Sequence, residues 1–407
     1  MEQLDALKGL RILDFTWVLA GPGAVRFLAD HGAEVIKVER LGEGDIGRRV
    51  VPFAGGIRGT NRSSYYNNIN RGKYGITLNL ADPRGVEVVK RLVPLCDVVF
   101  ENFTAGVMRR LGLSYDVLKE IKPDLIMISM AGLGHSGPYR DYVAFGPTLQ
   151  ALSAISYLTG FPDRDPVGFG YSYSDFTGGW GGALACLEAL HYRNKTGKGQ
   201  WVDVSQLETL CALMGPGLLD YSVNKAVPRR TGNRLPHEVG SPHGAYRCQG
   251  EDRWCVIAVF NDEEWRRFCR AIGNPPWTAE ERFSTVLGRL ENQDDLDRLV
   301  ESWTATHPAE EVMHLLQWEG VAAGVVQDAR DLIENDPQMK HRQFWVELEH
   351  PEIGKIGYEG VPFKLSETPG RLKRPAPLLG EYNSLVYGEI LGMSSKQIEE
   401  YATEGVF

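Results

Sequence analysis

The order of apolar and polar positions in the first third of the chain predicts alternating strands and helices. Short apolar runs, typical of buried strands, stand at residues 10–15, 33–39, 97–103 and 124–132. Helical patterns separate them, at residues 24–32, 86–96 and 117–123. The AGPG stretch at 20–23 is predicted to be a turn, and Pro22 suits the first turn of the helix after it. Strand–helix–strand units imply parallel strands, so we expect a doubly wound, Rossmann-like α/β fold here.

The pattern changes twice in the rest of the chain. Residues 174–222 have a helical pattern, whereas residues 223–244 are rich in Pro, Gly and charge, which indicates a loop at a domain boundary. A hairpin is predicted at 245–260, amphipathic helices follow to residue 318, and an apolar strand stands at 320–327. The Pro-rich C-terminal tail is expected to end in a short helix.

Composition is typical of a globular protein and excludes some functions. The sequence has 407 residues, of which 43% are hydrophobic and 24% charged, and its formal net charge is −9. The acidic balance disfavours nucleic-acid binding, and the chain lacks the run of about 18 apolar residues that a membrane span needs. The six cysteines form no CxxC pair and the N-terminus has no signal-peptide pattern, so a reduced, cytoplasmic protein is expected.

Two classes of bound cofactor are disfavoured by their motifs. A dinucleotide fingerprint needs a third small residue after Gly21–Gly23, but Arg26 stands there, so no NAD site is expected. Metal motifs such as H-E-x-x-H and cysteine clusters are absent, and the histidines, among them His135, His237 and His243, are scattered. We therefore expect neither a metal nor a tightly bound cofactor.

Basic residues gather near the ends of the predicted strands. They are Lys37, Arg40, Arg71, Lys73, Arg109 and Arg110. The carboxyl ends of parallel strands line the ligand crevice in such folds, and the planar fork of arginine suits phosphate. The group predicts a phosphate-bearing ligand, with solvated surface charge as the alternative.

A single acid, Asp175, stands before the glycine-rich helical run TGGWGGALACL. One interpretation is a helix N-cap, which stabilises a helix by about 1 kcal/mol. The other is a nucleophilic carboxylate. The glycines fit both, because they leave space around an attacking acid and also permit close helix packing. The surrounding Tyr171, Tyr173, Phe176 and Trp180 are either core residues or the lining of an apolar acyl pocket.

A series of segments resembles the class III coenzyme A transferases of the CaiB/BaiF type. In chain order they are LKGLRILDFTWVLAGPGAVRFLADHGAEVIKVER, NRGKYGITLNLADPRG, DVVFENFTAGVMRRLGL, SDFTGGWGGALACLEALHYRNKTGKGQWVDVSQLE, DPQ, GVPFKLSETPG and APLLGE. The resemblance runs nearly end to end. It implies an enzyme whose substrates are an acyl-CoA thioester and a carboxylic acid.

The resemblance also implies an architecture. A large Rossmann-like domain would be built from both chain ends, residues 1–224 and 326–407, and a smaller α/β domain from residues 225–325. Two chains would pass through each other as interlocked rings, either as a homodimer or as a heteromer of related chains.

The family's catalytic aspartate falls on Asp175. The resemblance implies that CoA moves from a donor such as succinyl-CoA to an organic acid through covalent aspartyl intermediates. The residues implied to contact CoA are Leu19, Ala20, Arg40, Leu78, Asn79, Asn102, Phe103, Thr104, Arg110 and Phe145. Backbone N–H groups of Gly240–Gly244 are the candidate oxyanion donors. Gly146 stands where the formyl-CoA branch has a glutamate, which suggests space for a larger acceptor.

Two alternatives stay open. The α-methylacyl-CoA racemase branch pairs its aspartate with an upstream histidine, but the matching residue here is Phe145, and His135 lies ten residues earlier. Racemisation by two bases requires a second proton carrier beside the aspartate, so CoA transfer is favoured. The chain is alternatively one subunit of a heteromeric transferase, as in the benzylsuccinate type.

Overall fold

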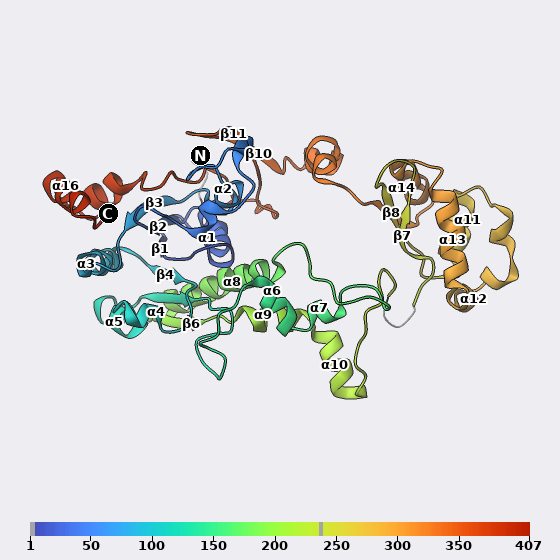
Figure 1. Ribbon diagram of the computed structural model, residues 1–407, viewed down its shortest axis with the longest axis horizontal. Coiled ribbons are helices and arrows are strands. Elements are labelled where there is room, and N and C mark those ends of the chain that lie inside the picture. The colour runs from blue at the N-terminus through green and yellow to red at the C-terminus, as the bar shows by residue number, and fades with distance from the viewer. Residues whose placement is uncertain (1–4, 236–238) are drawn as a thin grey trace. The chain divides into compact units, whose positions relative to one another are not determined.

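The computed structural model describes residues 5–235 and 239–407 and divides into two compact units (Figure 1). Unit 1 comprises the residues up to Ser156 together with Gly168–Ala226 and Gln338–Phe407. Unit 2 comprises Tyr157–Val167 and Val227–Pro337. Each unit has its own hydrophobic core.

A six-stranded parallel sheet forms the centre of unit 1; the N-terminal pattern predicted its parallel arrangement and four of its strands, but not Tyr74–Leu78 or Gln200–Asp203. Its strand order is β3-β2-β1-β4-β5-β6. This is the doubly wound order, in which successive strands are added first on one side of β1 and then, from β4, on the other side. The strands are β1 (Arg11–Asp14), β2 (Glu34–Arg40), β3 (Tyr74–Leu78), β4 (Val98–Glu101), β5 (Ile126–Ser129) and β6 (Gln200–Asp203). The last of these is a correction, because Gln200–Asp203 lies inside a region expected to be helical.

Helices cover both faces of the sheet. One face packs against α1 (Ala20–Asp30) and α8 (Tyr173–Thr196) in a single apolar cluster. The other face packs against α3 (Pro83–Leu92), α5 (Tyr115–Ile121) and the chain's C-terminal end. The remaining helices up to Asn224 are α2 (Ser64–Asn70), α4 (Val107–Arg110), α6 (Gly146–Leu152), α7 (Ile155–Leu158), α9 (Gln206–Leu213) and α10 (Gly215–Asn224).

The C-terminal segment returns to the sheet beside β3, drawn in red in Figure 1. The side chain of Asn383 accepts the backbone N–H of Thr77 at 2.9 Å, and the Tyr387 hydroxyl donates to Thr77 O at 2.6 Å. This region contains the antiparallel pair β10 (Trp345–His350) and β11 (Gly354–Glu359), then α16 (Ser395–Thr403), the short helix that the tail predicted.

Unit 2 confirms the hairpin and helices expected in the middle of the chain. Strands β7 (His243–Arg247), β8 (Trp254–Ala258) and β9 (Ala322–Val325) form an antiparallel sheet. Its helices are α11 (Asp262–Ala271), α12 (Val286–Glu291), α13 (Gln293–Thr304) and α14 (Ala309–Trp318), and α15 (Pro337–His341) follows at the junction with unit 1. Within the described residues, no helix is long and apolar enough to cross a membrane.

The glycines of α8 allow other helices to approach it closely. A Cβ added at Gly179 would lie 3.0 Å from Ala20 O, and one at Gly178 would lie 2.7 Å from Gln206 Cγ. Of the two roles considered for these glycines, the structure therefore shows close packing. The packing has a chemical consequence, since it holds the first turn of α1 against the first turn of α8, where Asp175 lies.

Candidate active site

A pocket of about 250 Å³ opens at the carboxyl ends of the central strands, beside the point where the strand order reverses. Segments that follow β1, β4 and β5 supply its walls, and the first turn of α8 supplies Asp175. The lining residues are Trp17, Val18, Tyr65, Asn102, Phe103, Thr104, Ala131, Gly132, Leu133, Arg140, Tyr142, Ala144, Phe145, Gly146, Pro147, Leu149, Ser172, Asp175 and Gln206. We call this the Asp175 pocket.

Trp17 and Asn102 join the two strands on either side of the reversal. The Asn102 side chain accepts the backbone N–H of Trp17 at 2.7 Å and donates to its carbonyl oxygen at 2.8 Å. The Trp17 ring meets the edge of Phe103 at a centroid distance of 6.1 Å. Trp17 and Phe103 also line a neighbouring pocket of about 330 Å³, so this aromatic pair borders both spaces.

The structure brings most of the expected CoA contacts to these two pockets. Asn102, Phe103, Thr104 and Phe145 line the Asp175 pocket, and Arg40, Leu78, Asn79 and Phe103 line its neighbour. Leu19 and Ala20 are buried and line neither, and Arg110 is exposed at the end of α4 and lines neither. Lining residues that sequence reasoning missed include Trp17, Tyr65, Arg140, Ser172 and Gln206.

Asp175 is the third residue of α8, not its N-cap. The N-cap of α8 is Ser172. The turn that was expected at residues 20–23, before α1, is in fact the first turn of α1. The Asp175 carboxylate accepts hydrogen bonds from the Ser172 side chain and from the backbone N–H of Ala20. Burial raises the pKa of Asp175 above its ordinary value, while these two hydrogen bonds act in the opposite direction. The site thus holds a partly desolvated carboxylate with two fixed donors.

Gly146 leaves the face of this carboxylate open. A Cβ at this position would lie 2.8 Å from Asp175 Oδ2 and 1.5 Å from Ser172 Oγ. A side chain there is incompatible with the present placement of Ser172 and Asp175. Across the pocket, burial and then the charge of Asp175 raise the pKa of Tyr65, so this phenol stays protonated and can donate.

The pKa of Asp175 predicts how activity depends on pH. A nucleophilic carboxylate reacts only in its ionised form, so an activity that depends on Asp175 should fall as pH falls through a pKa that lies above the ordinary range for aspartate, about 4. Ser172→Ala removes a hydrogen bond that stabilises the anion, so it should move the acid-side midpoint of kcat/KM to higher pH. Initial rates across a pH series measure both effects. An unchanged midpoint in Ser172→Ala, with Ser284→Ala as the control, would show that Ser172 does not set this pKa.

A strained loop immediately precedes the first turn of α1. Val18, a β-branched residue, has φ +68°, a left-handed conformation that is costly for such side chains. The Asp45 carboxylate accepts the Val18 N–H at 3.1 Å, and Lys37 lies 3.1 Å from Asp45 and donates to Thr16 O at 2.7 Å. Both side chains of this ion pair are fully buried. The loop that delivers the Ala20 N–H to Asp175 is therefore fixed by buried charges.

These contacts correct the expectation for three of the basic residues. Lys73 is fully buried and lies 2.9 Å from the Asp14 carboxylate, Arg71 is buried and lies 2.8 Å from Asp30, and Lys37 pairs with Asp45. They are neither phosphate ligands nor solvated surface charges. Burial lowers the pKa of Lys73 to about 8, against the opposing effect of Asp14. Arg71 and Lys73 each reach an acid that lies far away in the sequence, whereas Asp45 follows Lys37 closely.

Replacing Lys73 with methionine should lower the free energy of unfolding by about 3–5 kcal/mol, because Asp14 would lose the nearest cation to its buried charge. Denaturant titrations of the parent and the variant measure the difference. Lys198→Met, at an exposed position after α8, is the control and should change the free energy by less than about 0.5 kcal/mol. Equal stabilities of parent and Lys73→Met would contradict a structural role for this pair.

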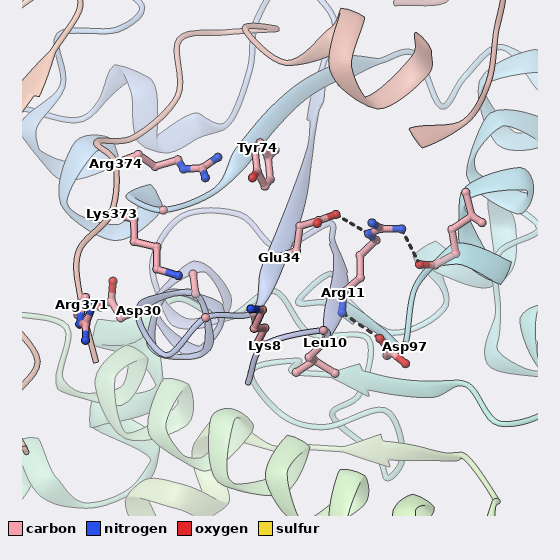
Figure 2. A pocket seen from close by; sticks show the side chains of 16 residues that line it. Lys8, Leu10, Arg11, Asp30, Glu34, Tyr74, Asp97, Arg371, Lys373 and Arg374 are labelled. Atoms are coloured by element: carbon pink, nitrogen blue, oxygen red, sulfur yellow. Dashed lines mark hydrogen bonds and ion pairs between the residues drawn. The ribbon is translucent and has the colours of Figure 1, made fainter. Parts of the chain in front are cut away.

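A second cluster of cations lies at the opposite edge of the sheet, around a pocket of about 350 Å³ (Figure 2). Its basic residues are Lys8, Arg11, Arg371, Lys373 and Arg374. Arg11 is paired with Glu34, Lys373 is paired with Asp5, and Arg374 lies 4.1 Å from the ring centroid of Tyr74. The pocket marks where the returning C-terminal segment joins the amino ends of the strands, away from Asp175.

Among the described residues, no histidine lines the Asp175 pocket. His135 lies outside the Asp175 pocket, with Nε2 3.4 Å from Glu101 in a separate cavity, and burial lowers its pKa. His243 belongs to unit 2, and His237 lies outside the described residues. Phe145, at the position where the racemase branch has histidine, is an exposed aromatic on the pocket wall. Among the described residues, no group of three or more metal-ligating side chains exists.

Comparison with known proteins gives consistent matches over almost the whole chain. The model of CoA-transferase family III matches residues 7–383. Succinyl-CoA–D-citramalate CoA-transferase of Chloroflexus aurantiacus is 36% identical over 392 residues, which are 96% of each chain. Succinyl-CoA:glutarate CoA-transferase of Homo sapiens is 31% identical over 407 residues, 100% of this chain and 91% of that protein. The crystal structure of a CAIB/BAIF family protein from Brucella suis matches with a TM-score of 0.87 at 31% identity, covering 95% of this chain and 100% of that one.

Proposed function

Because this chain belongs to CoA-transferase family III, an enzyme family that moves CoA between acyl groups, we propose that Asp175 is the residue through which CoA passes. The observation that carries this assignment is the Asp175 pocket itself. It places a partly desolvated carboxylate at the carboxyl edge of the sheet, with Ser172 and the Ala20 N–H as donors. No other carboxylate and no histidine lines it among the described residues. A lone carboxylate suits acyl transfer and does not suit two-base racemisation.

The proposed reaction has two symmetrical halves. An Asp175 oxygen attacks the thioester carbonyl of the donor, the C–S bond breaks, and a mixed anhydride and CoA thiolate result. The thiolate then attacks the aspartyl carbonyl, which releases the donor acid as its carboxylate and leaves an aspartyl-CoA thioester. The acceptor carboxylate attacks this thioester, and the returning thiolate attacks the acceptor's acyl carbon, which regenerates Asp175. No proton is gained or lost overall, so the site needs no general base.

Stabilisation of the tetrahedral oxyanions requires fixed donors. The segment expected from the sequence to supply them, Gly240–Gly244, belongs to unit 2, where β7 begins at His243. The CoA substrate is proposed to occupy the two neighbouring pockets, with its thioester end toward Asp175 and the rest of the molecule past Trp17 and Phe103. The ten residues named in the sequence analysis remain its proposed contacts, and seven of them line these two pockets.

Dicarboxylic acids are the proposed substrates, with succinyl-CoA as donor. The relatives from Chloroflexus aurantiacus and Homo sapiens are named for succinyl-CoA and for citramalate or glutarate. Succinate, citramalate and glutarate each carry two carboxylates. The test uses the purified chain alone with succinyl-CoA and a panel of acids, and follows new acyl-CoA by chromatography. Transfer to at least one dicarboxylic acid is expected. Exchange that begins only after a related protein is added would instead show that the chain is one subunit of a heteromer.

We propose that the protein works as a dimer of interlocked chains. In each chain, residues 1–224 and 326–407 would form the large domain and residues 225–325 the small domain. The support for the dimer is an unpartnered apolar surface: α8 exposes Trp180, Leu184 and Leu187, and α10 has no buried residue and exposes Leu219 and Val223. Light scattering should give twice the chain mass, and Leu219→Asp with Val223→Asp should reduce it. A monomer at micromolar concentration in the parent protein would contradict the proposal.

A further inference from the structure

We propose that Arg140 binds the second carboxylate of the dicarboxylic substrates while Asp175 reacts with the first. This inference rests on the proposed function and names the residue that selects the substrate class. It makes Arg140 a specificity residue of the Asp175 pocket, and it applies equally to the donor and to the acceptor, because both occupy the same place in the two halves of the reaction.

Charge inside the pocket is the first argument. Among its described lining residues, Asp175 and Arg140 are the charged ones, and the others are neutral polar or apolar. A dicarboxylate that presents one end to Asp175 keeps a full negative charge at its other end. Moving such a charge from water into a pocket without a cation is costly. Arg140 is the group of this pocket that can offset that cost.

The guanidinium group of Arg140 is available to a ligand. Arg140 Nε makes a long contact with the carboxylate of the neighbouring Asp141, at 3.4 Å. The two terminal nitrogens make no hydrogen bond to the described residues. The side chain is 56% exposed. The terminal N–H groups can therefore form the paired hydrogen bonds that guanidinium makes with a carboxylate.

The wall near Arg140 and Asp175 suits a short methylene chain. Ala144, Phe145, Pro147 and Leu149 provide apolar side chains, and Gly146 provides none. All of them belong to the segment that leads from Arg140 into α6. A substrate held at both ends would lay its carbons along this segment, so the same loop would set both the charge and the length that the pocket accepts.

A different role for Arg140, contact with a CoA phosphate, makes the opposite prediction. A phosphate contact would be lost with every acyl-CoA alike, whereas a carboxylate contact matters only when the acyl group carries a second carboxylate. The comparison of succinyl-CoA with butyryl-CoA separates the two, because these thioesters have the same number of acyl carbons and differ in that carboxylate.

The experiment measures kcat/KM of the parent, Arg140→Gln and Arg140→Lys with both thioesters. Arg140→Gln should lose at least about 30-fold with succinyl-CoA and change less than about threefold with butyryl-CoA, and Arg140→Lys should recover part of the loss. Arg91→Gln, an exposed position of α3, is the matched control. If butyryl-CoA turnover is below detection, inhibition constants of free succinate and butyrate give the same comparison.

Equal loss with both thioesters, or no loss with either, would overturn the proposal. Failure of the proposed function looks different: the parent would then transfer no CoA, or Asp175→Asn would remain active with succinyl-CoA. Unchanged thermal unfolding of the Arg140 variants shows that a loss of rate does not come from misfolding.

Discussion

Asp175→Asn is expected to abolish CoA transfer, with turnover at least about a thousandfold below the parent. The amide has nearly the shape of the carboxylate and keeps an acceptor oxygen for the Ser172 hydroxyl and the Ala20 N–H, so the fold should survive. It lacks the negative oxygen that attacks the thioester, and it cannot form the anhydride or the aspartyl-CoA thioester. Initial rates with succinyl-CoA and a dicarboxylic acceptor measure the loss.

Glu120→Gln, an exposed position on α5, is the control for loss of one acidic group and should keep the parent's rate. Thermal unfolding of Asp175→Asn should match the parent or exceed it, because a buried charge has been removed. An Asp175→Asn enzyme that works within tenfold of the parent would mean that another group carries the acyl chain.

Gly146→Ala is expected to lower kcat by about a hundredfold, the second largest effect. The added Cβ would stand 1.5 Å from Ser172 Oγ and 2.8 Å from Asp175 Oδ2, so both groups must move. A displacement of about 1 Å at a reacting group is enough for a loss of this size. Turnover of the variant under saturating succinyl-CoA tests it.

Gly23→Ala in α1 is a matched control, because a Cβ there meets nothing within 4 Å. It should keep the parent's activity and gain slightly in stability, since alanine is the better helix former. Parent-like turnover in Gly146→Ala would show that the open face of Asp175 is not required.

The parallel sheet could be predicted because its central strands are continuous apolar runs. Both edge strands were missed. Tyr74–Leu78 is short and contains a glycine, and the residues of Gln200–Asp203 alternate between half-buried and exposed and include polar side chains. The start of α1 was placed too late for a related reason. Gly21 and Pro22 are typical of turns, but close contact with α8 and the tolerance of Pro in a first turn allow the helix to begin at Ala20.

The place of Asp175, our proposed nucleophile, in a pocket was predictable, and its surroundings were less so. Asp175 is marked by the glycine-rich helix and by the family resemblance. Trp17 could have been found from its place directly after the first strand, at the edge where ligands bind. Arg140 lies in a loop without a periodic pattern, and only the folded chain shows that this loop borders Asp175. Lys73 was misjudged because its partner Asp14 is distant in sequence. Lys37 was misjudged because only the fold shows that Asp45, after β2, lies beside it.

Trapping the covalent intermediate tests the central claim most directly. The purified protein is incubated with succinyl-CoA, treated with hydroxylamine, digested and examined by mass spectrometry. The account predicts a hydroxamate on the peptide that contains Asp175, formed only when the thioester is present. Complete CoA exchange with an unmodified Asp175 peptide, or a hydroxamate on a different acid, would contradict it.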